Sequence, residues 1–413
     1  MQWTKGQSDA LEMISSLRSA EAGSVGVLLG YAGTGKTTLI REIAQNRTNT
    51  IVLAPTGKAA LRVEEATGHE ASTIHRWLYR PFEDEEGEVH FARCDPKGES
   101  FAGTHGALIV IDEASMVGRR LWEDLEAVAR ENRNRILLVG DDYQLPPIES
   151  GWNALEQRPA HFARLDEIVR QAMNSPIVVA ASAVRTGEPI PYAIGKLPVT
   201  RGVTVQHQVA AGAREGSPIL VYTNRMRQSL NSWVRHKLGK PPRLSRGEPL
   251  LVLLNSYDLG VFNGEIVAFQ EWTEEPGSFS TQIEVKRKTI TVPLGIAMVR
   301  IGETAQEVVL AVAPEYVPSA WLREAAEEEA RTAFGREIHF LHADLGYVLT
   351  CHKAQGSEWP DVLVMLEPQV YHTAEGGRRF IYTAITRAKQ TCRILVPPWN
   401  FDIPARRFPA LAV

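Results

Sequence analysis

Residues 30–37 read Gly-Tyr-Ala-Gly-Thr-Gly-Lys-Thr and follow the apolar run Val27-Leu28-Leu29. A strand that enters a glycine-rich turn and then a helix is the context of a phosphate-binding loop. Backbone N–H groups can wrap a triphosphate only where side chains stay clear, which explains the three glycines of this stretch. The loop therefore predicts that the chain binds a nucleoside triphosphate.

Two side chains of this loop have predicted chemical roles. Lys36 should reach the β- and γ-phosphates, and Thr37 should offer its hydroxyl to Mg²⁺. The helix that follows would direct the positive end of its dipole at the anion. The other loop positions predicted to contact the nucleotide are Gly30, Ala32, Gly33, Thr34, Gly35 and Thr38.

A second carboxylate site follows in the sequence. Residues 108–113 read Leu-Ile-Val-Ile-Asp-Glu, an apolar strand that delivers two acids at its end. In a phosphate-loop protein, Asp112 would hold Mg²⁺ and Glu113 would polarise a water for attack on the γ-phosphate. The next apolar run ends in Gly-Asp-Asp-Tyr-Gln-Leu-Pro-Pro at 140–147, which should bring Gln144 within reach of the same pocket. A plain turn rich in Asp and Pro is the alternative for that stretch.

Composition limits the class of protein. The 413 residues are 44% hydrophobic and 23% charged, typical of a soluble globular protein of two to four domains. The net charge of −4 means that nucleic-acid affinity must come from local basic patches. No apolar run approaches the roughly 20 residues of a membrane span. The N-terminus lacks a signal-peptide core, so we expect a cytoplasmic protein. The three cysteines have neither zinc nor disulfide spacing: Cys94, Cys351 and Cys392.

Two sets of apolar runs indicate two α/β lobes. Near-continuous Val, Ile and Leu in each run is typical of parallel strands that helices cover on both faces. Two such sheets predict two nucleotide-binding-type lobes with a ligand between them. The runs lie at 26–30, 51–55, 107–112 and 135–140, and then at 218–223, 346–350, 361–366 and 392–396.

Two segments interrupt this rhythm. Residues 89–93 lead into Asp95-Pro96-Lys97-Gly98, which suits a type I turn, and so predict a short β-hairpin within 80–105. Several short apolar runs punctuated by Gly and Pro lie between 245 and 345 and predict a small inserted β-barrel. Residues 319–334 should form a helix that ends before Gly335.

The order of the motifs resembles the superfamily 1 helicases, and most closely their RecD-like and bacteriophage Dda-like branch. The resemblance runs from residue 3 to residue 389. It is carried by Gln7, the loop at 30–37, and the stretches at 54–60, 72–75, 112–113, 140–146, 167–171, 222–224, 263–265, 350–358 and 382–388.

The resemblance implies two RecA-like lobes that hydrolyse ATP between them and move 5′ to 3′ along single-stranded DNA. It assigns lobe 1A to 1–79 and 106–170, and lobe 2A to 171–244 and 346–413. The hairpin at 80–105 would match the strand-separating pin, called 1B, and the insert at 245–345 would match an SH3-like barrel, called 2B.

Further site residues come from the resemblance alone. Gln7 would read the adenine edge with its paired donor and acceptor. Arg170 and Arg387 would act as arginine fingers, which stabilise charge on the γ-phosphoryl oxygens. The residues that would couple nucleotide to strand are Gln355, Gly356 and Glu358, with Glu358 on the ribose hydroxyls.

The implied partners are single-stranded and forked duplex DNA. Hydroxyls, amides and backbone N–H groups at matching positions can grip phosphates without reading sequence. A basic run at 225–246 is a second candidate surface, with a solvated helix face as its alternative. The implied DNA-binding residues are Pro55, Thr56, Lys58, Thr73, His75, Phe91, Asn224, Thr350, His352 and Lys353.

Three functions fit these motifs. The leading one is an ATP-dependent DNA helicase. The others are a translocase that displaces proteins or acts on RNA, and an ATPase subunit of a recombination or nuclease complex. RecD-like subunits of such complexes often carry a long N-terminal extension, which this sequence lacks, so we expect an autonomous, monomeric motor.

Overall fold

The computed structural model describes most of the chain, namely residues 3–45, 49–83, 89–93, 104–147, 152–157, 159–169, 174–188, 197, 199–201, 204–256, 258–285, 288–311, 319–367, 370 and 374–397. Contacts divide the chain into two compact units. The first comprises Met1–Lys196 and Glu375–Thr386, and the second comprises Leu197–Ala374 and Arg387–Val413. Within the described ranges, no helix combines the length and apolar character that a membrane span requires.

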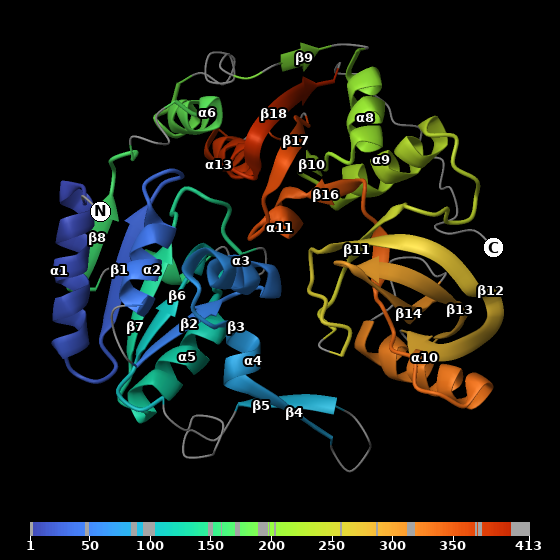
Figure 1. Ribbon diagram of the computed structural model, residues 1–413, viewed down its shortest axis with the longest axis horizontal. Coiled ribbons are helices and arrows are strands. Elements are labelled where there is room, and N and C mark those ends of the chain that lie inside the picture. Colours follow the sequence, from blue (N-terminus) through green and yellow to red (C-terminus); the bar gives the residue numbers. More distant parts are fainter. Residues whose placement is uncertain are drawn as a thin grey trace. The chain divides into compact units, whose positions relative to one another are not determined.

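The first unit is built on a six-stranded parallel sheet (Figure 1). Its apolar runs alternate their side chains between two faces, and each face has its own buried cluster. In sheet order the strands are β3 (Ala71–Thr73), β2 (Thr50–Ala54), β6 (Leu108–Ile111), β7 (Arg135–Gly140), β1 (Val25–Gly30) and β8 (His161–Leu165).

Helices cover both faces of this sheet, as the continuous apolar strands predict. Residues of α1, α2 and α3 pack on one face. Residues of α4 and α5 pack on the other, together with the short 3₁₀ helix Ala154–Glu156. Another 3₁₀ turn, Ala114–Met116, follows β6. The helices are α1 (Lys5–Ser19), α2 (Lys36–Gln45), α3 (Gly57–Thr67), α4 (Ile74–Leu78), α5 (Arg119–Glu131), α6 (Pro176–Arg185) and α13 (Ala374–Ile385).

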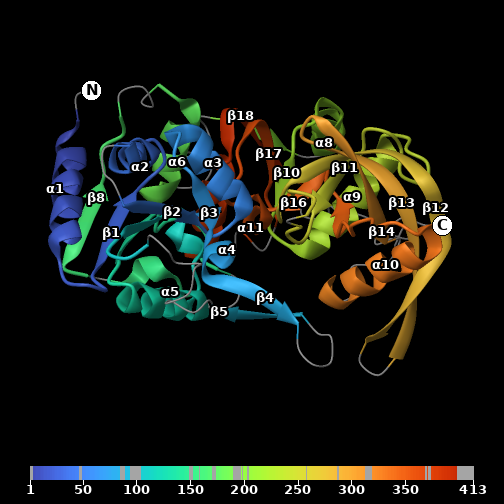
Figure 2. The same ribbon diagram turned by 60° about the horizontal axis from the view of Figure 1, so that its bottom comes forward.

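A two-stranded ribbon leaves this unit after α4 and projects beyond the sheet (Figure 2). It pairs β4 (Tyr79–Glu83) with β5 (Val89–Arg93), antiparallel. The sequence predicted a hairpin closed by a turn at 95–98, in which strand 89–93 would pair with residues after that turn. This prediction is corrected, because strand 89–93 pairs with residues 79–83, which precede it. The predicted turn at 95–98 lies outside the described residues.

The second unit holds a five-stranded parallel sheet and an inserted antiparallel sheet, which share one apolar core. The parallel sheet has the order β16 (Val348–Thr350), β10 (Ile219–Val221), β17 (Trp359–Met365), β18 (Ala388–Val396) and β9 (Val199–Arg201). Its helices are α8 (Thr204–Glu215), α9 (Asn224–Lys237) and α11 (Cys351–Ala354).

The insert is a curved antiparallel sheet with α10 (Ser319–Phe334) packed against it. Register shifts in β12, including one between Glu274 and Phe279, add the extra residues that bend a strand. The expected helix thus has the predicted bounds, whereas the SH3-like barrel stays a prediction. The strand order is β14 (Thr304–Ala311), β13 (Lys288–Ile301), β12 (Ile266–Val285), β11 (Pro249–Val252) and β15 (Ala343–Leu345).

The observed units differ from the expected domain boundaries. Helices α6 and α13 group with the first unit, although the motif order assigned both to the second lobe. Helix α13 groups with the first unit because its Tyr382 and Thr383 side chains hydrogen-bond to loops of the first sheet. The inserted sheet begins at Pro249 and ends at Leu345, within the expected range 245–345.

Candidate nucleotide and nucleic-acid sites

Three loops of the first unit meet at one edge of its sheet. Strands β6, β7 and β1 are neighbours and run parallel, so their carboxyl ends lie side by side. The phosphate loop follows β1, Asp112 and Glu113 follow β6, and Gln144 lies in the loop after β7. The structure thus brings together the residues that the sequence predicted for the first half of a nucleotide site.

The phosphate loop has the backbone that its glycines predict. Gly33 and Gly35 have φ values of 79° and 88°, a region that disfavours other residues. A Cβ on Gly30 would lie 2.7 Å from Thr34 Oγ1. The Lys36 ammonium donates to the Gly30 carbonyl at 2.7 Å and to the Tyr31 carbonyl at 3.0 Å, so its charge lies at the loop. Thr37 and Thr38 follow in the first turn of α2, and both are partly exposed.

Gln7 contacts the phosphate loop directly. Its amide nitrogen donates to the Thr34 carbonyl at 3.2 Å, and its oxygen accepts from Thr4 N in a capping box that begins α1. A Cβ on Gly35 would come within 2.6 Å of the same amide nitrogen. Gln7 therefore ties α1 to the loop, and its adenine-reading role stays a prediction.

The two acids after β6 are buried. Asp112 is 3% exposed, and its Oδ2 atom has no hydrogen-bond partner among the described residues. Burial raises the pKa of Asp112, the neighbouring Glu113 raises it further, and the Arg62 and Lys36 cations act in the opposite direction. Glu113 has φ 50° and ψ 38°, and its Oε1 lies 3.5 Å from Arg62 Nη2.

Arg62 is a site residue that sequence reasoning missed. It lies on α3, about 50 positions before the acid that it pairs with, and no local pattern joins the two. Arg62 places a cation beside the Glu113 carboxylate.

Mg²⁺ fits the oxygen atoms at this edge. The buried, unpartnered Asp112 Oδ2 and the Thr37 hydroxyl are ligands of the kind that Mg²⁺ prefers. A single protein carboxylate with a hydroxyl is also the usual protein share of a nucleotide-bound Mg²⁺.

The remaining predicted ATP-site residues lie in the second unit. Arg387, 2% exposed, donates to the Ser357 carbonyl at 3.4 Å, next to Gln355 and Gly356. Gly356 has φ 73°. Glu358 forms a surface pair with Lys389 at 3.9 Å. The structure gathers these residues around one turn, and Arg170 lies outside the described residues.

The same strand–Thr–helix arrangement occurs twice in each unit. In the first unit, Thr56 lies two residues after β2 and Thr73 ends β3, and their side chains cap α3 and α4. In the second, Thr223 lies two residues after β10 and its side chain caps α9, whereas Thr350 ends β16 and is the N-cap residue of α11 without a side-chain capping bond among the described residues. Both strand pairs are neighbours at an edge of their sheet. Helix N-termini attract phosphate, so these four helix starts are candidate phosphate contacts.

Of the other predicted DNA-binding residues, all except Phe91 lie within the first turn of these helices or directly before it. Asn224 and His75 are exposed, and burial lowers the pKa of Lys353. Phe91 is in β5, and its side chain lies outside the described residues. The remaining positions, all partly exposed, are Pro55, Lys58 and His352.

The basic run at 225–246 has a structural use. Arg227 pairs with Asp344 at 2.6 Å, and Arg235 pairs with the fully buried Glu248 at 2.7 Å. The first pair joins α9 to β15 of the inserted sheet, and the second joins α9 to the residue that precedes β11. Two cations of the run are therefore paired within the protein, and the run stays a predicted DNA-binding surface.

The folds and sites described above define a P-loop NTPase with two RecA-like lobes. Two family models match the chain, an AAA domain over residues 2–206 and a UvrD-like helicase C-terminal domain over residues 345–395. The first model covers the whole sheet of the first unit, and the second covers β16, β17 and most of β18 in the second unit.

Curated relatives narrow the assignment. The ATP-dependent RecD2 DNA helicase of Deinococcus radiodurans is 30% identical over 88% of this chain and 46% of its own length. The RecBCD enzyme subunit RecD of Mycobacterium tuberculosis is 25% identical over 90% of this chain and 66% of its own length. The ATP-dependent DNA helicase dda of Enterobacteria phage T4 is 30% identical over 45% of this chain and 43% of its own length. The chain belongs to the superfamily 1 helicases of the RecD- and Pif1-like type.

Solved structures agree on the fold. Pif1 helicase from Bacteroides, in complex with ADP-AlF3 and ssDNA, matches 96% of this chain and 92% of its own with a TM-score of 0.53 and 16% identity. Pif1 helicase from Candida albicans matches 99% of this chain and 97% of its own with a TM-score of 0.52 and 19% identity.

Proposed function

We propose that this chain is an ATP-dependent motor that moves 5′ to 3′ along single-stranded DNA and unwinds duplex DNA. The observation that carries the proposal is the nucleotide edge of the first unit, where Lys36, Asp112, Glu113 and Gln144 follow three adjacent strands. The named activities of the RecD2 and Dda relatives support it.

Each residue of the nucleotide edge would have its own role in ATP hydrolysis. Lys36 would neutralise charge on the terminal phosphates, and Glu113 would orient the attacking water. Thr37 and Asp112 would hold Mg²⁺, which when bound neutralises charge on the β- and γ-phosphates. Arg387 and Arg170 would stabilise the transition state, and Gln7, Gln355 and Glu358 would position the nucleotide.

DNA would lie along the four threonine-capped helix starts. Contacts of this kind reach phosphates and not base edges, so they suit a motor that must pass any sequence. Two such ends on each unit would grip the strand at two places. We include single-stranded and forked DNA as partners, and we propose a monomer.

The polarity test uses forks that carry a single-stranded tail on one side only. We expect unwinding of the 5′-tailed fork and ATPase stimulation by DNA above that by matched RNA. Unwinding of the 3′-tailed fork alone would reverse the polarity. ATPase stimulation without unwinding would indicate a translocase, and stimulation by RNA alone would indicate an RNA-directed motor.

The β4–β5 ribbon is our candidate for the strand-separating pin. Its base is fixed to α5, because Tyr79 donates to Asp124 at 2.5 Å and Arg93 pairs with Glu131 at 3.6 Å. A wedge that must resist a duplex needs such a fixed base.

Replacing residues 81–92 with a short Gly/Ser linker should abolish most single-turnover unwinding and leave DNA-stimulated ATPase largely intact. The reason is that the replaced segment contains none of the predicted ATP-site residues, whereas Tyr79 and Arg93 are kept. Fork unwinding and ATPase would be measured on the same preparation. Unwinding close to the wild-type rate would assign the wedge elsewhere, most directly to the inserted sheet.

A further inference from the structure

Helix α13 directs three polar side chains at loops of the first unit. Arg379, Tyr382 and Thr383 are spaced three and four residues apart, so they share one helix face. Arg379 donates to the Asp142 carbonyl at 3.0 Å, and the Thr383 hydroxyl accepts from Leu145 N at 3.0 Å. Side chains of α13 therefore hold the loop that follows β7.

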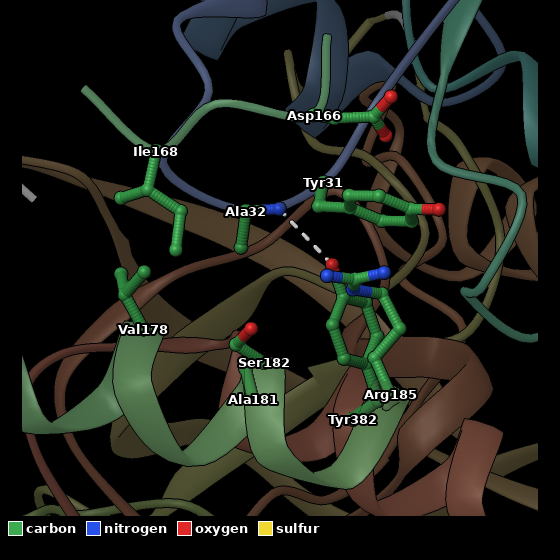
Figure 3. Close-up of a pocket in the computed structure, with 9 residues that line it drawn as sticks. All are labelled: Tyr31, Ala32, Asp166, Ile168, Val178, Ala181, Ser182, Arg185 and Tyr382. Carbon is green, nitrogen blue, oxygen red and sulfur yellow. Dashed lines mark hydrogen bonds between the residues drawn. The ribbon is translucent and has the colours of Figure 1, made fainter. Parts of the chain in front are cut away.

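Tyr382 contacts two loops at once. Its hydroxyl accepts from Ala32 N of the phosphate loop at 3.0 Å and donates to the Asp141 carboxylate. Figure 3 shows the hydroxyl directed at the Ala32 amide, with the Arg185 guanidinium and the Tyr31 ring beside it. Tyr382 is 1% exposed, so neither bond is shared with bulk solvent.

Asp141 connects the Tyr382 hydroxyl to Gln144 through hydrogen bonds. Its other carboxylate oxygen accepts from Tyr143 N at 3.0 Å, and its carbonyl accepts from Gln144 N at 3.2 Å. The Gln144 side chain is 5% exposed, and its Oε1 atom has no hydrogen-bond partner among the described residues. A movement of Asp141 would therefore move the residue that faces the nucleotide edge.

We infer that Tyr382 is a positioning residue for ATP hydrolysis. Its hydroxyl fixes the phosphate loop and the Gln144 loop at a set distance from each other. The inference rests on the proposed ATPase function. Without the hydroxyl, the Ala32 N–H and the buried Asp141 carboxylate each lose a partner, which favours a shift of both loops. Misplacement by about 1 Å can cost on the order of 10²-fold in rate.

The test replaces Tyr382 with phenylalanine, which keeps the ring and its edge-on contact with Tyr143 at 5.2 Å. We expect kcat for ATP to fall by about 10–100-fold. KM for ATP should stay within about threefold, because Lys36 and the loop glycines still bind the phosphates. Nucleotide affinity would be measured separately with a fluorescent ATP analogue.

Tyr347→Phe is the matched control. It also removes a buried tyrosine hydroxyl that donates to a carboxylate, that of Glu248, but this bond lies in the core of the second unit. Its kcat and KM should equal those of the wild type. A change in Tm of similar size in both variants would show that lost stability does not explain the loss of kcat.

Asp141→Asn tests the same link from its other end and should lower kcat in the same way. The inference is overturned if Tyr382→Phe retains wild-type kcat. It is also overturned if kcat per folded molecule is unchanged once the active fraction has been counted by nucleotide binding. A wild-type protein that hydrolyses no ATP would refute the proposed function instead, so the two failures are distinguishable.

Discussion

Lys36→Ala is expected to lower ATP hydrolysis by at least about 10³-fold. The ammonium of Lys36 already lies at the phosphate loop, on the Gly30 and Tyr31 carbonyls, so its position needs little rearrangement. Alanine removes the cation at the point where charge develops on the transferred phosphoryl group. Phosphate release under saturating single-stranded DNA would measure the loss.

Binding of single-stranded DNA should survive this change, because the threonine-capped helix starts do not include Lys36. Fluorescence anisotropy with a labelled oligonucleotide provides that measurement. Lys5→Ala, which removes an exposed lysine at the start of α1, is the control for net charge. Wild-type turnover by Lys36→Ala would refute the assignment of the phosphate loop.

Arg387→Ala is expected to lower kcat for ATP by at least about 10²–10³-fold while ATP still binds. A guanidinium that acts on the transition state changes kcat, whereas a ground-state contact changes affinity. Arg387 is 2% exposed, so its side chain is held in place before any nucleotide arrives. Steady-state kinetics together with equilibrium ATP binding would separate the two roles.

Two further variants make this result specific. Arg387→Lys keeps the charge but loses the planar fork, and it should recover only a small part of kcat. Arg331→Ala removes an exposed cation on α10 of the same unit and should leave kcat unchanged. A fall in ATP affinity with unchanged kcat would make Arg387 a ground-state binding residue.

Eight of the parallel strands were predictable because they read as apolar runs. The strands β3, β8 and β9 were not predicted, and β3 and β8 are only partly buried. Residues 135–140 were predicted as a strand, and β7 has these bounds. The ribbon was less predictable, since its strands are short and polar and the turn signal at 95–98 drew the pairing forward. Strand 89–93 was found, but its partner was not.

Motif order predicted that some candidate ATP-site residues would lie in the first unit and others in the second. It did not predict which side chains hold those residues in place. Gln144 was placed by the rule that parallel strands end at one edge of a sheet. The hydroxyl that holds its loop belongs to Tyr382, more than 230 positions later. Tyr382 belongs to a motif that the sequence showed, but the sequence did not predict the groups to which its hydroxyl would hydrogen-bond.

The sequence by itself determined the candidate nucleotide site of this protein, because a glycine-rich loop and a strand-end carboxylate pair each require particular residue types at fixed local spacing. Tertiary structure decided which distant groups hold these residues in place. Arg62 beside Glu113, Tyr382 between Ala32 and Asp141, and the α9 arginines on the inserted sheet all join segments far apart in the chain. Such pairs depend on how helices and strands pack, and local spacing carries no record of that.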